Sequence, residues 1–341
     1  MIEAATTARP RCAGRMRIGA LGAGWIGRQR LQSLVAGCDV DLVAVADPDP
    51  EARAAARMLA PHAAGVSELE ELLDRELDGI VIATPSALHA DQAIAALRTG
   101  AAVFCQKPLA RSAAETNRVI DTARREDLLL GIDLSYRHTT AAQAIHDALA
   151  HGDIGEVHAV ELVFHNAYGP DKPWFTRRSE AGGGCLIDLG THLLDLCLWL
   201  TGGGSATVQA AHMTCRGRTV DAGSEEVEDF ALAQLDTESG VVVRLACSWF
   251  LPAGRDCVFE VTAYGTEGAL TMRNVQGSFY DFVAEHQRAT TSRRIADPSP
   301  DWGAGAIQRW GRRLVQGTRF DPDVQRLTGL ASIIDQIYAA A

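Results

Sequence analysis

The stretch that decides the fold of this chain is Arg17-Ile18-Gly19-Ala20-Leu21-Gly22-Ala23-Gly24-Trp25-Ile26-Gly27. It is a short apolar run that ends in Gly-x-Gly-x-x-Gly and then opens into a helical pattern. A second apolar run, 43–46, stops on Asp47, twenty residues after Gly27. A strand, a glycine-rich turn, a helix and an acid at these distances indicate a dinucleotide-binding βαβ unit. The alternative is an ordinary βα turn of another α/β protein.

The three glycines of this turn each have a predicted task. Gly22 takes the tight turn after the strand, and Gly27 lets the helix lie close to the sheet. Gly24 leaves room for a pyrophosphate because it has no side chain. The helix begins at Trp25 and Ile26, where free N–H groups form the positive end of the helix dipole. We therefore expect the pyrophosphate of a dinucleotide to bind there.

Asp47 indicates which dinucleotide binds. A carboxylate at the end of the second strand accepts hydrogen bonds from both hydroxyls of an adenosine ribose, and its charge repels a 2′-phosphate. The next residues, Pro48, Asp49 and Pro50, supply no basic side chain to bind such a phosphate. The sequence therefore favours NAD over NADP as the cofactor.

Length and composition limit the class of protein. The 341 residues exceed what one core usually serves, so two domains are expected. The net charge of −11 argues against nucleic acid as a partner, because phosphate binding needs a basic surface. No apolar run approaches the length of a membrane span. The eight cysteines lack a Cys-x-x-Cys pair or metal-ligand spacing, so we expect reduced thiols, a cytoplasmic protein and no metal site.

The order of predicted elements divides the chain into three parts. Because Met16 directly precedes the first strand, residues 1–15 are expected to be a disordered leader or to result from an upstream start. Over 16–134, strand and helix patterns alternate, which predicts a doubly wound parallel sheet, the NAD-binding Rossmann domain. Over 135–341, helices and a series of strands predict a second, α+β domain with a large, open, mostly antiparallel sheet. The predicted strands are 16–21, 42–46, 79–83, 101–105, 129–132, 156–164, 206–215, 227–236, 240–250, 256–264 and 268–273.

The segment 285–321 does not follow either pattern. Between residues 288 and 319 it contains seven arginines, and it also holds Trp302 and Trp310. Two interpretations stay open, a lid or arm that reaches a neighbouring subunit and a solvated connector. An amphipathic helix is expected from 324 to the end of the chain.

Three further stretches carry a resemblance to a known family. They are Thr84-Pro85-Ser86-Ala87-Leu88-His89, Val103-Phe104-Cys105-Gln106-Lys107-Pro108-Leu109 and Gly183-Gly184-Cys185-Leu186-Ile187-Asp188-Leu189-Gly190-Thr191-His192-Leu193-Leu194-Asp195. In order and spacing they resemble the motifs of the Gfo/Idh/MocA oxidoreductases, the family of glucose–fructose oxidoreductase and inositol dehydrogenase. The resemblance runs from about residue 16 to 341. It implies a Rossmann domain, a second domain with a large open sheet, and a homodimer or homotetramer formed through that sheet.

The resemblance also implies the catalytic residues. Family members oxidise or reduce secondary alcohols of sugars and cyclitols, and His192 would be the acid/base that exchanges the hydroxyl proton. Asp188, four residues earlier, would share a helix face with His192, orient its imidazole and contact a substrate hydroxyl. Lys107 would stabilise the developing alkoxide. Taken singly, a surface lysine, a core histidine and a helix N-terminal acid are ordinary alternatives.

Two positions depart from the family pattern. The family usually has Glu before the motif lysine, where this chain has Gln106, and often Asn where it has Ser86. An amide at 106 keeps hydrogen bonding but removes a negative charge beside Lys107 and the nicotinamide. The resemblance also places a wider set of residues at the cofactor: Gly22, Gly24, Trp25, Ile26, Gly27, Asp47, Thr84, Pro85, His89, Gln106 and Lys107.

Substrate contacts are expected where the two domains join. Tyr136 and Arg137 follow the last Rossmann strand, with a hinge role as the alternative. His165, Asn166 and Tyr168 end the first strand of the second domain and should face the cleft. In the polar, aromatic and basic segment 171–178, Trp174 is expected to stack on a sugar face and Arg177 or Arg178 to bind an anionic group. An ordinary surface loop is the alternative for this segment.

These expectations converge on one leading function. The chain is expected to be an NAD-dependent dehydrogenase for a secondary hydroxyl of a sugar, aminosugar or cyclitol, for example at the 3-position of a hexose in an antibiotic-sugar pathway. An aminoglycoside would suit the acidic charge. One alternative is an NAD-dependent glycosidase of the same fold without net redox change. Another is a non-catalytic dinucleotide sensor, against which the retained Lys107, Asp188 and His192 argue.

Overall fold

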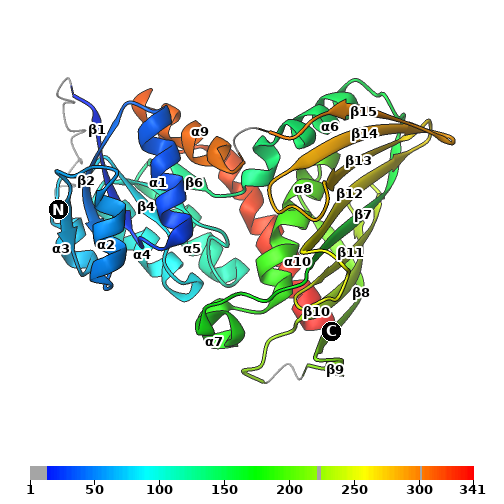
Figure 1. Cartoon of the computed structure of the whole chain (residues 1–341), viewed down its shortest axis with the longest axis horizontal. Helices are drawn as coiled ribbons and strands as arrows, with labels where there is room; N and C mark the ends of the chain where they lie inside the picture. The colour runs from blue at the N-terminus through cyan, green and yellow to red at the C-terminus, as the bar shows by residue number, and fades with distance from the viewer. Residues whose placement is uncertain (1–13, 221–223, 300–301) are drawn as a thin grey trace, which may run out of the picture.

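The computed structural model describes residues 14–220, 224–299 and 302–341. The predicted leader, 1–15, lies outside the described residues except for its last two. Figure 1 shows two sheets, one in each half of the molecule, with a layer of helices between them.

The first sheet is parallel and has, in the described part of the chain, six strands in the order β3-β2-β1-β4-β5-β6. This is the doubly wound order that the alternating pattern predicts. The strands are β1 (Met16–Leu21), β2 (Val40–Ala46), β3 (Ala64–Val66), β4 (Gly79–Ile82), β5 (Ala102–Cys105) and β6 (Leu130–Ile132). The helices are α1 (Trp25–Gly37), α2 (Pro50–Arg57), α3 (Leu69–Leu73), α4 (Ser86–Arg98) and α5 (Ala113–Arg125). Only β3 was not expected, because a strand of three residues carries no periodicity.

The second sheet has nine strands among the described residues, in the order β15-β14-β13-β12-β7-β11-β10-β8-β9. β7 and β11 pair in parallel and the other pairs are antiparallel, so the sheet is mostly antiparallel as predicted. Its strands are β7 (Val157–Asn166), β8 (Ala206–Cys215), β9 (Arg218–Thr219), β10 (Phe230–Thr237), β11 (Val242–Ser248), β12 (Cys257–Gly265), β13 (Ala269–Asn274), β14 (Phe282–Arg288) and β15 (Thr291–Ala296).

Helices cover one face of this sheet. α6 (Thr140–Ala150) packs on β14, α8 (Thr191–Thr201) on β7 and α10 (Arg326–Ala340) on β8. α10 also packs against α5, so it lies between the two sheets, as Figure 1 shows. A π-helical turn, Leu186–Gly190, leads directly into α8.

The arginine-rich segment is neither a lid nor a solvated connector. It forms part of β14, all of β15 and α9 (Ala304–Val315), which crosses back and packs on α1. There the Trp310 ring lies 5.7 Å from the ring of Phe104 and covers Gly79 and Gly131. The second half of the chain thus contributes a helix to the first sheet.

One helical run is longer and more apolar than the sequence pattern predicts. The 24 residues Arg178–Thr201 include a short helix (Arg178–Ala181), the π-helical turn and α8, and they contain an 18-residue window with a mean hydropathy of 1.3, enough by length and composition to cross a membrane. In the structure 78% of that window is buried inside the molecule. The run therefore packs as a core helix of this fold.

Candidate active site

A cavity of about 1470 Å³ lies where the two domains face each other. The carboxyl ends of the first sheet's strands open into it through Leu21, Ala46, Thr84, Gln106 and Asp133. The second domain adds side chains from β7, the loop after β7, the π-helical turn and α8. Ligands of doubly wound sheets bind at this edge, so the cavity is the candidate active site.

The glycine-rich turn has the geometry that a dinucleotide requires. Gly22 has a φ of +88°, and a Cβ there would come within 2.5 Å of the Ala83 carbonyl oxygen. A Cβ on Gly27 would overlap the Gly22 carbonyl, so only glycine lets α1 approach the turn. A Cβ on Gly24 would meet nothing within 4 Å, which leaves open space over the start of α1. No described side chain caps this helix end, so its N–H groups are free for a pyrophosphate.

Asp47 stabilises the same turn. One carboxylate oxygen accepts a hydrogen bond from the Ala23 N–H (2.7 Å) and the other from the Asp49 N–H (2.9 Å). The guanidinium of Arg53 is bonded to the backbone carbonyls of Asp47 and Pro48. The cavity lining at this end is strongly acidic, with carboxylates from Asp47, Asp49, Glu51, Glu68 and Glu70.

Thr84, Pro85 and His89 also line the cavity. The His89 ring lies between the carbonyl oxygens of Thr84 (2.8 Å) and Pro108 (2.7 Å) and is almost fully buried. Burial lowers the pKa of His89 below its ordinary value. His89 therefore ties the end of β4 to the turn that carries Lys107.

Lys107 meets the second domain at the inner end of the cavity. Its Nζ donates to Asp188 Oδ1 (2.5 Å) and to the Asp188 carbonyl oxygen (2.7 Å). The other carboxylate oxygen of Asp188 accepts a hydrogen bond from Trp249 Nε1 (3.1 Å). A cation held this way can donate to a reacting oxygen while its charge stays balanced.

His192 lies on α8 and lines the same cavity. Its ring is 4.7 Å from the ring of Tyr136, and its Nδ1 is buried with no partner among the described residues. Burial holds the pKa of His192 well below its ordinary value, and the positive charges of Lys107 and Arg30 lower it further. The imidazole is therefore neutral at neutral pH and able to accept a proton.

The expectation that Asp188 orients His192 is corrected. Both side chains line the cavity, but no hydrogen bond joins them within the described structure, because both Asp188 oxygens are engaged by Lys107 and Trp249. Asp188 lies within the π-helical turn Leu186–Gly190 and His192 follows it on α8, so the two are not spaced as on a regular α-helix. Asp188 positions the lysine instead.

The residues expected to bind substrate separate into two groups. Tyr136, Asn166 and Trp174 line the cavity. Four others do not, because each has a polar partner elsewhere. Arg137 pairs with buried Asp195, His165 bonds Ser248 (2.8 Å), Tyr168 donates to Asp256 (2.8 Å) and Arg177 pairs with Glu180 (2.6 Å).

The position of His165 follows from strand geometry. Successive side chains of β7 alternate between the two faces of the sheet. Phe164 and Asn166 line the cavity, so His165 between them faces the opposite side, where it stacks on Phe230. The end of β7 therefore lies at the cavity, but the alternation directs Phe164 and Asn166 into it and His165 away from it.

Several functional candidates have no signal in the sequence. Arg30, Asp133 and Ser135 line the cavity beside Gln106. The carboxylate of Glu228, which is fully buried, accepts hydrogen bonds from the N–H groups of Gly184 (3.0 Å) and Leu186 (2.9 Å) and so holds the start of the turn that carries Asp188. None of these has a local pattern that would reveal it.

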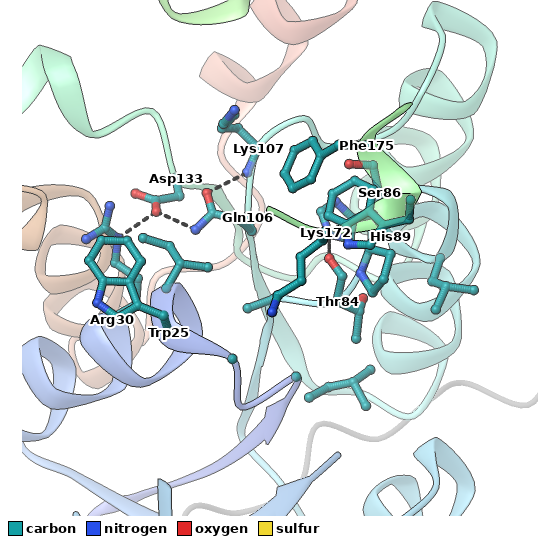
Figure 2. A pocket seen from close by; sticks show the side chains of 18 of the residues that line it. Trp25, Arg30, Thr84, Ser86, His89, Gln106, Lys107, Asp133, Lys172 and Phe175 are labelled. Carbon is teal, nitrogen blue, oxygen red and sulfur yellow. Dashed lines mark hydrogen bonds and ion pairs between the residues drawn. The ribbon is translucent and has the colours of Figure 1, made fainter. Parts of the chain in front are cut away.

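Lys172 did leave a signal in the sequence. Only two of the 32 basic residues are lysines, Lys107 and Lys172, and both line this cavity. Figure 2 shows the side chain of Lys172 extending into the cavity from the second domain. Because all the other basic residues of the chain, histidines aside, are arginines, the two lysines could have been singled out from the sequence as candidate site residues.

Two family models match the chain. The NAD-binding Rossmann fold of the GFO/IDH/MocA oxidoreductase family matches residues 16–134, and the C-terminal domain of the same family matches residues 142–271. Among curated proteins, dTDP-3,4-didehydro-2,6-dideoxy-alpha-D-glucose 3-reductase of Streptomyces violaceoruber is 36% identical over 96% of this chain and 95% of its own length. 1,5-anhydro-D-fructose reductase of Ensifer adhaerens is 31% identical over 76% of each chain.

Solved structures share the fold. KijD10, a 3-ketoreductase from Actinomadura kijaniata in complex with NADP and TDP-benzene, has a TM-score of 0.83 at 22% identity and covers 96% of this chain and 98% of its own. GenD2 from gentamicin A biosynthesis, in complex with NAD, has a TM-score of 0.79 at 24% identity, with 98% and 97% covered. At these identities the likeness shows the fold alone.

Proposed function

This chain belongs to the Gfo/Idh/MocA oxidoreductase family and is an NAD(P)-dependent oxidoreductase, and we propose that it uses NAD to interconvert a secondary alcohol and a ketone on a sugar, aminosugar or cyclitol. The observation that carries this proposal is the convergence of Lys107, Asp188 and His192 on the cavity that the glycine-rich turn also borders. A bound nicotinamide would supply the hydride acceptor or donor.

The chain's own residues account for the proton. In the oxidative direction the neutral imidazole of His192 accepts the hydroxyl proton, and in the reductive direction it returns it. The Lys107 amine donates a hydrogen bond to the same oxygen and stabilises its developing negative charge. Asp188 keeps the amine in place through two contacts, and Trp249 keeps Asp188 in place.

The cofactor preference is part of the proposal. Asp47 and the other carboxylates at that end of the cavity support NAD, because a 2′-phosphate would face their negative charge. The residues fit a dinucleotide at the other points as well, with free N–H groups at the start of α1 and open space above Gly24.

For the substrate, we propose a 3-position hydroxyl or ketone of a hexose in an antibiotic-sugar pathway. The support is the names of relatives, a dTDP-sugar 3-reductase among them, and the aromatic lining of the cavity at Tyr136, Phe164, Trp174 and Phe175. An aminated sugar such as an aminoglycoside also suits the acidic protein.

We propose a homodimer or homotetramer formed through the outer face of the second sheet. Support comes from apolar side chains on its strands, such as Leu232 and Val242, which are about two-fifths exposed. Size-exclusion chromatography with light scattering measures the subunit number.

We place the protein in the cytoplasm because the seven described cysteines are all free thiols.

The experiment that tests the function is a titration with NAD and NADP followed by a 340 nm screen. Sugars, polyols, aminoglycosides and nucleotide-linked hexoses are offered with NAD, and 3-keto sugars with NADH. Net formation or consumption of NADH on one substrate class supports the proposal. Turnover of an aryl glycoside without net NADH would favour the redox-neutral glycosidase, and binding without any turnover would favour a sensor.

A further inference from the structure

A buried ion pair lies directly behind the catalytic lysine. Arg30 Nε is 2.6 Å from Asp133 Oδ2, and the two side chains are 4% and 1% exposed. Ser135 donates to the other oxygen of Asp133, and the Arg30 guanidinium lies over the Trp302 ring at 5.1 Å. Removal of one partner from such a pair leaves an uncompensated buried charge, which is costly. The two side chains are therefore fixed in position, and so are the groups bonded to them.

Gln106 connects this pair to Lys107. Its Nε2 donates to Asp133 Oδ2 (2.9 Å), and its Oε1 accepts a hydrogen bond from the Lys107 backbone N–H (3.0 Å). Figure 2 shows this chain of contacts from Arg30 through Asp133 and Gln106 to Lys107. The amide can take only one orientation here, because a carboxylate accepts and a backbone N–H donates.

The same geometry explains why an acid does not suit position 106. A carboxylate there would still accept from the Lys107 N–H, but its other oxygen would face Asp133 with no donor between them. Two carboxylates this close cannot both be ionised, and Arg30 supplies one positive charge for two negative ones. An amide is the side chain that can donate to Asp133 and accept from Lys107 at once.

We propose that Gln106 is a positioning residue. Its amide bonds the buried Arg30–Asp133 pair on one side and the Lys107 backbone on the other, and so holds the Lys107 side-chain amine against Asp188. The inference rests on the role proposed above for Lys107. Both partners belong to the first domain, and Arg30 on α1 also packs against Trp302 and Gly303 from the second half of the chain. Asp188 thus binds the side-chain amine of Lys107, and Gln106 binds its backbone N–H.

A swap of the acid and the amide tests this inference. Gln106→Glu and Asp133→Asn are made singly and together, and kcat, KM for NAD, KM for the substrate identified in the screen and Tm are measured. Each single variant is expected to lower kcat about 10- to 100-fold, the usual effect of a catalytic group misplaced by about 1 Å. KM for NAD should change less than kcat, since the pyrophosphate site is untouched although position 106 is expected beside the nicotinamide.

The double variant decides between positioning and mere packing. It keeps the total charge and restores a donor and an acceptor between positions 106 and 133, although the amine of the new amide at 133 can no longer accept from Arg30 Nε, so part of the lost kcat should return. If the double variant is as slow as the product of the single losses, Gln106 is not a coupling residue and the proposal is wrong. Gln106→Met removes both hydrogen bonds without adding charge, and it should lower kcat even if the charged variants unfold.

Two controls accompany the swap. Gln308→Glu changes another half-buried amide, which donates to the Ser33 carbonyl away from the cavity, and it should leave kcat unchanged. Lys107→Ala is assayed beside the swap. A Lys107→Ala variant with full turnover would refute the proposed function, whereas loss in Lys107→Ala without recovery in the double variant would refute only the positioning role.

Discussion

Lys107 and Asp188 are joined twice, by the amine to the side-chain oxygen (2.5 Å) and by the amine to the main-chain carbonyl (2.7 Å), although 81 positions separate them in the sequence. The lysine follows β5 of the first domain, and the aspartate lies in the π-helical turn of the second. Their side chains are 16% and 18% exposed. The cleft between the domains is therefore closed at its inner end by the pair on which the proposed chemistry depends.

Loss of either catalytic side chain should slow turnover and spare cofactor binding. Lys107→Ala and His192→Ala are each expected to lower kcat by roughly 10²- to 10⁴-fold, the contribution of a general acid or base. NAD affinity should stay close to that of the wild type, because Gly24 and Asp47 are unchanged. Steady-state kinetics and a fluorescence titration with NADH measure the two effects. Normal turnover in both variants would show that the active site is elsewhere.

Trp249→Phe tests the support of Asp188. The variant keeps an aromatic ring but loses the Nε1–H that holds the second oxygen of Asp188. We expect kcat to fall about tenfold, as for one hydrogen bond to a charged group worth about 1.5–3 kcal/mol. Trp310→Phe is the matched control, since its ring packs on Phe104 outside the cavity. It should lower Tm without lowering kcat of the folded enzyme.

Gly24→Ala and Gly27→Ala should fail for different reasons. The Cβ at Gly24 meets nothing within 4 Å, so the fold should be unaffected, but the methyl group occupies the space reserved for the pyrophosphate. The Cβ at Gly27 would overlap the Gly22 carbonyl and should destabilise the protein by about 1–3 kcal/mol. Thermal melts and NADH titrations distinguish the two. Wild-type NAD affinity in Gly24→Ala would contradict the cofactor placement.

Asp47→Asn should move the cofactor preference toward NADP. The amide oxygen can still accept from the Ala23 N–H in the glycine-rich turn, at the loss of the bond from the Asp49 N–H, while the charge that repels a 2′-phosphate is gone. The ratio of Kd values for NADP and NAD should fall at least tenfold, roughly the worth of one charged hydrogen bond. Isothermal titration with both dinucleotides measures it, and an unchanged ratio would remove Asp47 as the selector.

The histidine at the centre of the site should respond to acid in a defined direction. Its pKa is lower in the folded protein than the ordinary value of about 6.5 in the unfolded chain. As pH falls through about 6.5, the unfolded chain takes up a proton that folded His192 does not, and stability falls. His192→Asn should therefore lose less Tm than the wild type between pH 7 and pH 5. An equal loss in both proteins would show that His192 titrates normally.

The catalytic pH profile should agree with this. Because His192 is neutral above its lowered pKa, kcat/KM should show no inflection near pH 6.5 from this residue. A profile of kcat/KM from pH 5.5 to pH 8 checks the point. An inflection at the ordinary histidine value that disappears in His192→Asn would contradict a neutral imidazole.

The local parts of the fold were predictable because they depend on short-range patterns. The turn at Gly22 and the close packing at Gly27 follow from the absence of a side chain. Ser112 caps α5 by accepting a hydrogen bond from the Glu115 N–H three residues later, a local arrangement typical of a helix start. The alternation of strands and helices over 16–134 leads to the observed strand order, since parallel strands need helical crossovers.

Contacts at long range were not predictable from these patterns. Arg30 and Asp133 are 103 positions apart and look like ordinary charged residues in the sequence, yet they form a buried pair behind Lys107. Arg137 was expected at the substrate, but Asp195, 58 positions later, lies close enough to take its guanidinium away from the cleft. Nothing local in either sequence neighbourhood signals the partner.

By itself the sequence determined the dinucleotide turn, the order of the two kinds of sheet and the residue types proposed to exchange the substrate proton. These are properties of spacing and side-chain type, which act over a few residues. Only the tertiary structure decided which charged groups neutralise one another and which remain directed into the cavity. Burial makes an unpaired charge or polar group costly, so partners distant in sequence come together, and that pairing can be known only once the chain is folded.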